Sequence, residues 1–219
     1  EAEANGATLA LNTDVVAAKF ENGIFAIETL DRDGQEMSLT CAELLIAGGL
    51  HSQTLAHNFT GLPEQSIPPQ HYARGCYFTL SGKAPFSTLI YPAPEQAGLG
   101  IHLTLDLGGQ ARFGPDVTWV EEPNYDVPEE KRAGFAAAIR KYYPALDENA
   151  LQTGYAGVRP KIQAPGEAAR DFLISDREAH GIDGLVILYG IESPGLTACL
   201  AIADHVENVL SRPQAKAAS

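Results

Sequence analysis

One stretch near the end of the chain decides the fold: Leu185-Val186-Ile187-Leu188-Tyr189-Gly190-Ile191-Glu192-Ser193-Pro194-Gly195, followed by residues 196–210. An apolar run bounded by glycine predicts a buried strand. The residues after it predict an amphipathic helix, with one apolar stripe formed by Leu196, Cys199, Leu200, Ala203, Val206 and Leu210. Ser193 is predicted to cap this helix and Pro194 to occupy its first position. The stretch therefore predicts a strand, a tight glycine loop and a helix N-terminus. Such an N-terminus can bind an anionic group, but geometry alone favours an ordinary connection between a strand and a helix.

A second unit of the same kind lies earlier in the chain. Residues 43–47 form an apolar strand that ends at Gly48-Gly49, and a short helix is predicted over 52–57. A meander is predicted before it, with an Asn22-Gly23 hairpin turn and strands at 8–12, 15–20, 24–30 and 36–40. Two strand–glycine–helix units indicate one layered α/β domain.

The middle of the chain has a different pattern. Short β-like segments with intervening turns are followed by one helix and a further strand: 76–80, 88–91, 100–105 and 111–113, then 129–143, then 154–162. The predicted class is α/β (α+β), with an antiparallel β domain at 67–164 inserted into a layered domain formed by 1–66 and 165–212. Residues 213–219 are predicted to fray.

Composition excludes several classes of function. The net charge is −13, and phosphate-backbone binding needs clustered Lys and Arg, so a nucleic-acid role is not expected. The cysteines, three in number and widely spaced, fit a reducing compartment, here taken as the cytoplasm, and form no metal-ligand pattern. We expect no signal peptide, and no apolar run in the sequence approaches the ~20 residues that a membrane span needs.

Six stretches, in order, are similar to a known family: residues 47–52, 86–92, 98–106, 112–116, 155–161 and 190–197. Together they resemble the C-terminal part of the FAD-dependent D-amino-acid-oxidase-like superfamily, and most closely the L-2-hydroxyglutarate dehydrogenase/oxidase family. The resemblance implies an FAD-binding three-layer domain with a β-meander and an antiparallel substrate domain. It also implies oxidation of L-2-hydroxyglutarate, or a similar 2-hydroxy acid, to the 2-oxo acid by hydride transfer to flavin.

The chain departs from the family pattern in two places. Family members begin with a strand and a Gly-x-Gly-x-x-Gly turn that binds the FAD pyrophosphate, and this chain has no such segment. Gly98-Leu99-Gly100 cannot serve, because a strand rather than a helix is predicted after it. We therefore expect the missing N-terminal FAD-binding segment to be a required partner and this chain alone to be inactive. The second departure is Ile46-Ala47-Gly48-Gly49, where the family usually has Asn-Ala-Ala-Gly.

The resemblance assigns cofactor contacts to three places. The backbone of Val15 would face the adenine, and Ala47, Gly48 and Gly49 would lie near the ADP part. The loop beside the flavin pyrimidine edge would comprise Gly190, Ile191, Ser193, Pro194, Gly195, Leu196 and Thr197. The alternatives are an ordinary strand valine and ordinary strand-to-helix turns.

Four residues are candidates for substrate chemistry. His102 lies between apolar neighbours on a predicted strand, and histidine can take a hydroxyl proton near neutral pH. Arg159 and Lys161 are two apart on a strand and share a face, as the binding of a dicarboxylate requires. Arg159 also matches the carboxylate-binding arginine of the wider superfamily, and Tyr91 falls in a matching stretch. The alternatives are a structural histidine and a strand with two solvated cations.

Two other functions remain open at this point. An amino-acid or secondary-amine oxidase on the same fold would also need Arg159 for its substrate carboxylate. A non-catalytic module could keep the fold without FAD. Composition and spacing leave the oligomeric state open.

Overall fold

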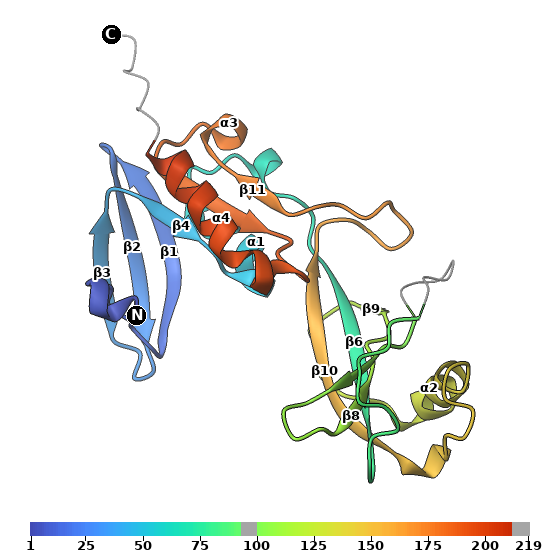
Figure 1. Ribbon diagram of the computed structural model, residues 1–219. Helices are drawn as coiled ribbons and strands as arrows, with labels where there is room; N and C mark the ends of the chain where they lie inside the picture. Colours follow the sequence, from blue (N-terminus) through green and yellow to red (C-terminus); the bar gives the residue numbers. More distant parts are fainter. Residues whose placement is uncertain (93–99, 212–219) are drawn as a thin grey trace. The chain divides into compact units, whose positions relative to one another are not determined.

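The computed structural model describes residues 1–92 and 100–211 (Figure 1). The chain divides into two compact units, which we call unit 1 (residues 1–70 and the chain from Ala168 onward) and unit 2 (His71–Glu167). The mixed α/β class is confirmed. Gly98 and Leu99, and the predicted frayed tail at 213–219, lie outside the described residues.

Unit 1 contains the predicted meander. Strands β1 (Thr13–Glu21), β2 (Ile24–Asp31) and β3 (Glu36–Cys41) are antiparallel neighbours, and β5 (Phe59–Thr60) pairs with the outer side of β1. Asn22 and Gly23 have φ values of 53° and 79°, as the predicted two-residue hairpin turn requires. The strand expected at 8–12 is absent, because no described strand pairs with this segment and Leu9 and Leu11 remain exposed.

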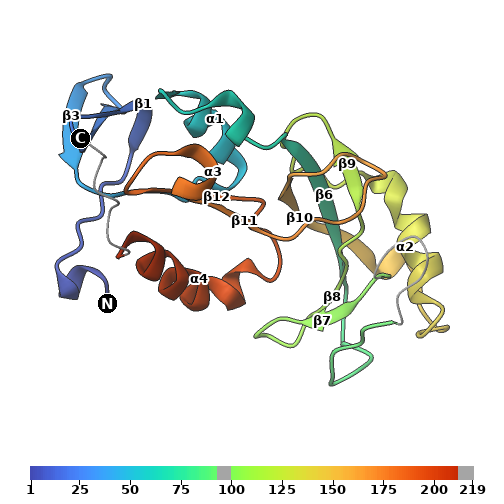
Figure 2. The same ribbon diagram turned by 90° about the horizontal axis from the view of Figure 1, so that it is seen from above.

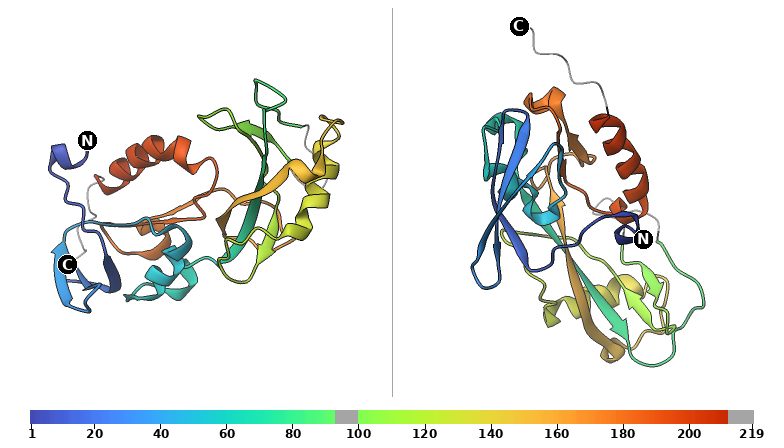
Figure 3. Two further views of the ribbon diagram at one scale, coloured as in Figure 1. Left: turned by 90° about the horizontal axis from the view of Figure 1, so that it is seen from below. Right: turned by 90° about the vertical axis from the view of Figure 1, so that its left-hand side faces the viewer.

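A small sheet forms the centre of unit 1. Strands β4 (Leu44–Ile46) and β12 (Leu185–Tyr189) are parallel, and β11 (Leu173–Ser175) pairs antiparallel with β12, in the order β11-β12-β4. All five β12 residues are buried, as the apolar run predicts. Helix α4 (Gly195–Leu210) covers one face, while α1 (Ser52–His57) and the meander lie on the other (Figures 2 and 3). This three-layer arrangement agrees with the predicted fold.

The start of α4 differs from the prediction. Pro194 is the residue before the helix, Gly195 is its first residue, and no side chain caps the N-terminus. Ser193 therefore lies outside the helix and is not its cap. Pro194 has a ψ of 41°, which is not a helical value, so the helix begins one residue later than the proline pattern indicates.

Four of the six residues in the predicted apolar stripe of α4 are exposed. The helix packs on β11 and β12 through Val206 and Leu210 of this stripe together with Ile202 and Val209, which the stripe did not include. Leu196 and Leu200 are 89% and 78% exposed, and Cys199 and Ala203 are exposed too. The packed face is therefore rotated around the helix from the face that the spacing predicts.

Unit 2 is built on one long antiparallel pair, β6 (His71–Leu80) and β10 (Leu151–Lys161). Strands β8 (Ala111–Phe113) and β7 (Leu103–Leu105) extend the sheet from β6, and β9 (Thr118–Val120) pairs with the other part of β6. Helix α2 (Arg132–Ile139) packs through Phe135, Ala136 and Ile139 against the apolar side chains of one sheet face.

Two predicted elements of unit 2 are shorter than expected. The segment at 88–91 contributes only a single bridge, between Ile90 and Leu103, and β7 begins at Leu103 rather than Gly100. The predicted helix over 129–143 consists of a 3₁₀ turn, η4 (Glu129–Lys131), followed by α2. After Ile139 the chain tightens into turns before Pro144, with the Tyr142 N–H bonded to the Ile139 carbonyl.

Short elements complete both units. They are η1 (Glu3–Asn5), η2 (Gly49–His51), η3 (Glu64–Ser66), η5 (Glu148–Ala150) and the single-turn helix α3 (Arg177–His180).

Candidate functional site

A cavity of about 260 Å³ lies in unit 1 between the meander, β4 and α1. Three of the residues predicted to contact a cofactor line it: Val15, Ala47 and Gly48. The other lining residues are Ala17, Ala18, Ile27, Leu44, Leu45, Ile46, Leu55 and Asn58. The wall is almost entirely apolar, and such a cavity suits a flat aromatic group held by few polar contacts.

The two glycines of the first turn have different roles. Gly48 has an ordinary φ of −77°, but a Cβ on it would lie 2.7 Å from the Leu55 side chain and 3.1 Å from the Ser52 nitrogen. Close approach of α1 therefore requires glycine there. Gly49 has a φ of +58°, which favours glycine for backbone reasons. Gly49 is not among the residues that line the cavity.

The second glycine loop lies at the same edge of the small sheet as the first. β4 and β12 are parallel with Ile46 opposite Ile187, so both loops follow the carboxyl ends of neighbouring strands. Ligands of open α/β sheets bind at this edge. Gly190 has a φ of +66°, and a Cβ on Gly195 would lie 2.6 Å from Ile191 Cγ2. The Thr197 hydroxyl donates to the Pro194 carbonyl at 2.8 Å, which holds the start of α4 against the loop.

Unmatched polar atoms occur next to both loops. Ser52 Oγ, Gln53 Oε1 and the Tyr189 hydroxyl are buried and have no hydrogen-bond partner in the described part of the chain. Ser52 and Gln53 open α1, and Tyr189 immediately precedes Gly190. Burial raises the pKa of the Tyr189 phenol above its usual range, so this group stays a neutral donor. Buried polar atoms of this kind mark places where a ligand or ordered water completes the hydrogen bonding.

In unit 2 the candidate substrate residues share the sheet face opposite the core. Cys76 and Phe78 of β6 point into the core, so Gly75 and Tyr77 point to the other face. Arg159 is paired with Ala73 and Lys161 with His71, which places both cations on that face as predicted. His102 precedes the core residue Leu103, so alternation directs it to the same face.

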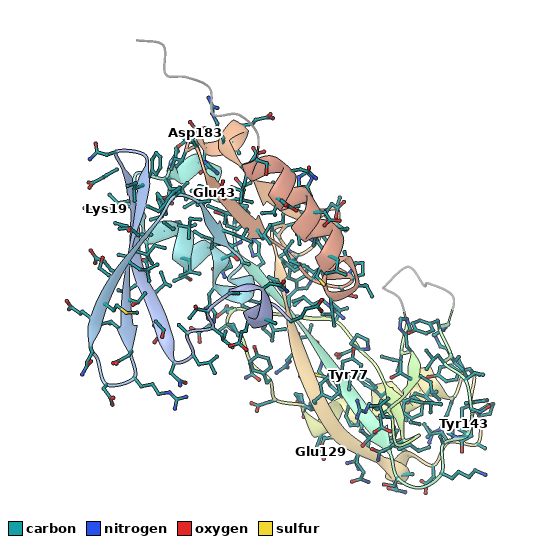
Figure 4. All side chains as sticks on the ribbon, turned by 60° about the vertical axis from the view of Figure 1, so that its left-hand side comes forward. Lys19, Glu43, Tyr77, Glu129, Tyr143 and Asp183 are labelled. Carbon is teal, nitrogen blue, oxygen red and sulfur yellow. The ribbon has the colours of Figure 1, made fainter. Side chains whose placement is uncertain are left out.

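Two pairs of rings lie in this region. Tyr77, labelled in Figure 4, stacks on Tyr155 with centroids 4.5 Å apart and an interplanar angle of 13°. Tyr91 contacts His102, with centroids 4.3 Å apart and planes tilted by 49°. Two predicted site residues are therefore brought together, and an unpredicted tyrosine pair is added.

A cation supports the tyrosine stack from β8. The guanidinium carbon of Arg112 lies 5.9 Å from the centre of the Tyr155 ring, and Arg112 Nη2 is 3.0 Å from Asp106 Oδ2. The backbone N–H of Gln110, followed by that of Gly108, donates to Asp106 and lowers the pKa of its carboxyl. The carboxylate thus stays ionised and holds Arg112 beside the ring.

Glycines leave room for two of these side chains. A Cβ on Gly75 would lie 3.3 Å from Arg159 Nη2 and 2.8 Å from Pro115 Cβ. A Cβ on Gly114 would lie 2.7 Å from Tyr77 Cδ1, and Gly114 has a φ of +143°. Sequence reasoning missed Tyr77, Tyr155 and both glycines. Their signal is the β6–β10 register, which the sequence alone does not reveal.

The pKa of Tyr77 depends on its neighbours on this face. Burial is the largest cause that raises the pKa of the Tyr77 phenol, the neighbouring Tyr155 adds to it, and the Arg159 charge opposes both. Tyr77 therefore remains a neutral hydrogen-bond donor close to a cation. An arginine beside a neutral phenol is suited to a carboxylate ligand, which accepts from both groups.

A separate ion pair stabilises β6 and carries no sign of ligand binding. Lys131 Nζ contacts Asp116 Oδ2 and donates to Thr118 Oγ1 at 2.5 Å, while Asp116 Oδ1 accepts from the Cys76 N–H at 2.7 Å. Both ends of the pair are thus tied to the backbone or to a hydroxyl.

Residues 1–92 and 100–211 contain no group of three or more His, Cys, Asp or Glu side chains that could hold a metal ion. No helix within those ranges combines the length and apolarity needed to cross a membrane.

Comparison with known proteins identifies relatives over nearly the whole chain. Residues 1–208 match the model of the DAO family, described as FAD dependent oxidoreductase. The chain is 44% identical to the mitochondrial L-2-hydroxyglutarate dehydrogenase of Arabidopsis thaliana, over 97% of this chain and 48% of that protein. It is 26% identical to the glycerol 3-phosphate oxidase of Mycoplasma pneumoniae, over 96% of this chain and 53% of that protein. The chain thus spans about half the length of the curated relatives it matches.

Solved structures agree on the fold. L-α-glycerophosphate oxidase from Mycoplasma pneumoniae, solved with FAD bound, superposes with a TM-score of 0.80 at 23% identity, covering 97% of this chain and 53% of that one. L-proline dehydrogenase from P. horikoshii superposes with a TM-score of 0.72 at 17% identity, covering 98% of this chain and 54% of that one.

Proposed function

Because this chain belongs to the DAO family of FAD-dependent oxidoreductases, we propose that it is part of an enzyme that oxidises L-2-hydroxyglutarate, or a similar 2-hydroxy acid, to the 2-oxo acid. The observation that carries the proposal is the identity with L-2-hydroxyglutarate dehydrogenase across almost the entire chain. FAD is the proposed cofactor. It would supply the group that accepts the hydride from the substrate carbon.

The layered domain that the sequence predicts at residues 1–66 and 165–212, most of which lies in unit 1, would bind the cofactor. The apolar cavity lined by Val15, Ala47 and Gly48 fits a flat heterocycle such as adenine, and Gly49 would shape the adjoining turn. The loop from Gly190 to Thr197 would lie beside the flavin. The first N–H groups of α4 favour negative charge and would stabilise it at the N1/C2-oxygen end of the ring.

Residues 67–164 would bind the substrate. We assign the α-carboxylate to Arg159, whose guanidinium offers a bidentate fork and lies beside the neutral Tyr77 phenol. Lys161 is two residues further along the same strand face, about 6.6 Å away by strand geometry. This is the Cα spacing of the two residues. Two long cationic side chains on one face suit a dicarboxylate, and Lys161 would meet the distal carboxylate.

His102 would take the hydroxyl proton of the substrate as its carbon-bound hydrogen leaves as hydride. The Tyr91 ring, in contact with the imidazole, would fix the orientation of His102 and cover the substrate. General-base catalysis requires this orientation, since the nitrogen must lie within hydrogen-bonding distance of the hydroxyl.

We also propose a partner and a cellular compartment for the chain. Its partner would be the N-terminal FAD-binding segment that carries the pyrophosphate loop, and the cysteine usage favours a reducing compartment such as the cytoplasm. An amino-acid or secondary-amine oxidase would use Arg159 in the same way, and no specific observation favours it here.

A substrate panel on the complete enzyme tests the proposal. The protein would be loaded with FAD, and the loss of visible flavin absorbance would be followed after anaerobic mixing with L-2-hydroxyglutarate, D-2-hydroxyglutarate, L-proline or glycerol 3-phosphate. We expect reduction by L-2-hydroxyglutarate to be the fastest by a wide margin. Faster reduction by L-proline or glycerol 3-phosphate would overturn the assignment, and no reduction by any of the four would point to a non-catalytic module.

A further inference from the structure

We propose that Asp106 and Arg112 are positioning residues for the substrate site: acting through Tyr155, they hold the Tyr77 ring in place beside Arg159. We call Asp106, Arg112 and Tyr155 the β8 brace. The inference rests on the proposed function, because Arg159 is the assigned anchor of the substrate carboxylate. It adds residues that do not bind the substrate themselves and affect its binding through Tyr77.

Tyr77 lies between the proposed base and the proposed carboxylate anchor. On one side, the Gly114 N–H donates to the His102 carbonyl at 3.0 Å, and a Cβ on Gly114 would lie 2.7 Å from Tyr77 Cδ1. On the other side, Arg159 Nη2 lies 3.3 Å from the position of a Cβ on Gly75, which is two residues from Tyr77 on β6. A bound substrate that reaches both His102 and Arg159 therefore passes Tyr77, and the orientation of this ring affects how the substrate binds.

The backbone does not fix the ring that stacks on Tyr77. The pairing of β6 with β10 shifts register between Thr153 and Ala156, so Gly154 and Tyr155 have no paired residue on β6. Tyr155 is also 49% exposed. Its nearly parallel stack on Tyr77, with an interplanar angle of 13°, therefore depends on contacts between side chains.

Arg112 supplies one of these contacts. Its guanidinium carbon lies 5.9 Å from the centre of the Tyr155 ring, within the range of a cation–π interaction. Asp106 holds the guanidinium, because Oδ2 accepts from Arg112 Nη2 at 3.0 Å. The other carboxylate oxygen, Oδ1, accepts from the N–H groups of Gly108 and Gln110 at 2.8 and 2.9 Å. One carboxylate thus joins the turn between β7 and β8 to a ring on β10.

The β8 brace should affect substrate binding more than the chemical step. Without Arg112, the half-exposed Tyr155 ring is free to leave the stack, and Tyr77 loses the neighbour that orients it. Binding must then order the Tyr77 ring as well as the substrate, which weakens binding. Once the substrate is bound, its reacting atoms meet the same groups as before. The expected signature is a higher KM with little change in kcat.

The first readout is steady-state kinetics of the complete enzyme with its 2-hydroxy acid. Arg112→Met keeps the length of the side chain without its charge, and should raise KM by about 3- to 10-fold with kcat within about 2-fold of wild type. Arg112→Lys restores a cation that can pair with Asp106, and its KM should return most of the way to wild type. Asp106→Asn keeps an oxygen for the two turn N–H groups but presents an amide nitrogen to Arg112, so it should resemble Arg112→Met.

The second readout is the tyrosine stack itself, observed by NMR in the substrate-free complete enzyme with labelled tyrosine rings. A nuclear Overhauser contact between Tyr77 and Tyr155 should be present in wild type and in Arg112→Lys. It should be lost in Arg112→Met and in Asp106→Asn. The control is Lys19→Met, which removes an exposed ion pair of unit 1 and should change neither readout.

A double variant distinguishes a brace that acts through Tyr155 from an independent effect of Arg112. Arg112→Met combined with Tyr155→Leu should raise KM no more than Tyr155→Leu alone, because both changes act through one ring. A KM increase equal to the product of the two single increases would overturn the inference. An intact Overhauser contact in Arg112→Met, or a lost contact with an unchanged KM, would also show it to be wrong. The Overhauser contact requires no turnover, so failure here is distinguishable from failure of the proposed function.

Discussion

Gly75 and Gly157 lie directly opposite each other on β6 and β10, yet added side chains would meet very different surroundings. A Cβ on Gly75 would meet Pro115 at 2.8 Å and the Arg159 guanidinium at 3.3 Å, whereas one on Gly157 would meet no atom within 4 Å. The proposed carboxylate anchor is therefore seated over a glycine.

The two glycines form a matched pair for mutagenesis. Gly75→Ala should destabilise unit 2 by about 1–3 kcal/mol through overpacking and should raise the KM of the complete enzyme for its 2-hydroxy acid. Gly157→Ala should leave both quantities close to wild type. Thermal denaturation and steady-state kinetics check the two effects. Equal behaviour of the two variants would mean that Arg159 is not held over Gly75.

The His102 imidazole gives a second prediction. His102→Ala in the complete enzyme should slow flavin reduction by about 10²–10⁴-fold, the usual contribution of general acid–base catalysis. FAD content should stay unchanged. The control is Tyr91→Phe, which keeps the ring against His102 and should cost much less. Stopped-flow reduction at saturating substrate is the measurement, and an unaltered rate in His102→Ala would return this residue to a structural role.

His180 gives a pH dependence of stability. It is buried, its Nδ1 accepts from the Ile182 N–H at 3.2 Å, and burial lowers its pKa below the ordinary value of 6.5. As the pH falls from 6.5 towards the lower pKa of His180 in the folded chain, the unfolded chain takes up a proton that the folded chain does not. The free energy of unfolding should therefore fall on acidification below pH 6.5. Well above that pH, the titration of His180 should not change the free energy of unfolding. Urea denaturation across pH should show a weaker dependence in His180→Gln, while His205→Gln, at an exposed site, should follow wild type.

Retention of FAD by the chain itself provides a fourth prediction. The chain lacks the Gly-x-Gly-x-x-Gly turn that holds the pyrophosphate in this fold, so the isolated 219-residue chain should carry little flavin after purification and gel filtration. Its visible absorption spectrum is the check. Stoichiometric flavin bound without any further polypeptide would contradict the division of the cofactor site between this chain and a partner segment.

Local sequence signals predicted the elements that depend on near neighbours. The Asn22-Gly23 hairpin and the buried strand 185–189 were predicted correctly, because turn conformation and apolar runs act over a few residues. The helix stripe failed for a physical reason. Leu196 and Leu200 follow the helical period, but the period cannot tell which apolar positions pack within this chain.

The sheet face of unit 2 that carries Arg159 and Lys161 also shows what local sequence signals cannot predict. Residue type and two-residue spacing were enough to put Arg159 and Lys161 on one face. Tyr77 and Tyr155 were missed because they are 78 positions apart in sequence and meet only through strand register. Their contact also depends on a register shift between Thr153 and Ala156, which no local motif signals.

In the proposed enzyme, Arg159 binds the α-carboxylate and Lys161 the distal carboxylate of a 2-hydroxy dicarboxylic acid. The most direct measurement is kcat/KM of the complete enzyme for L-2-hydroxyglutarate and for a short 2-hydroxy monocarboxylate, in wild type, Arg159→Lys and Lys161→Ala. Lysine cannot reproduce the bidentate fork, so Arg159→Lys should lower kcat/KM for both substrates, by roughly 30-fold or more if about 2 kcal/mol is lost. Lys161→Ala should penalise L-2-hydroxyglutarate and spare the monocarboxylate. Unchanged kcat/KM for both substrates in Arg159→Lys would contradict the account, and the strand would then be a charged edge without a role in binding.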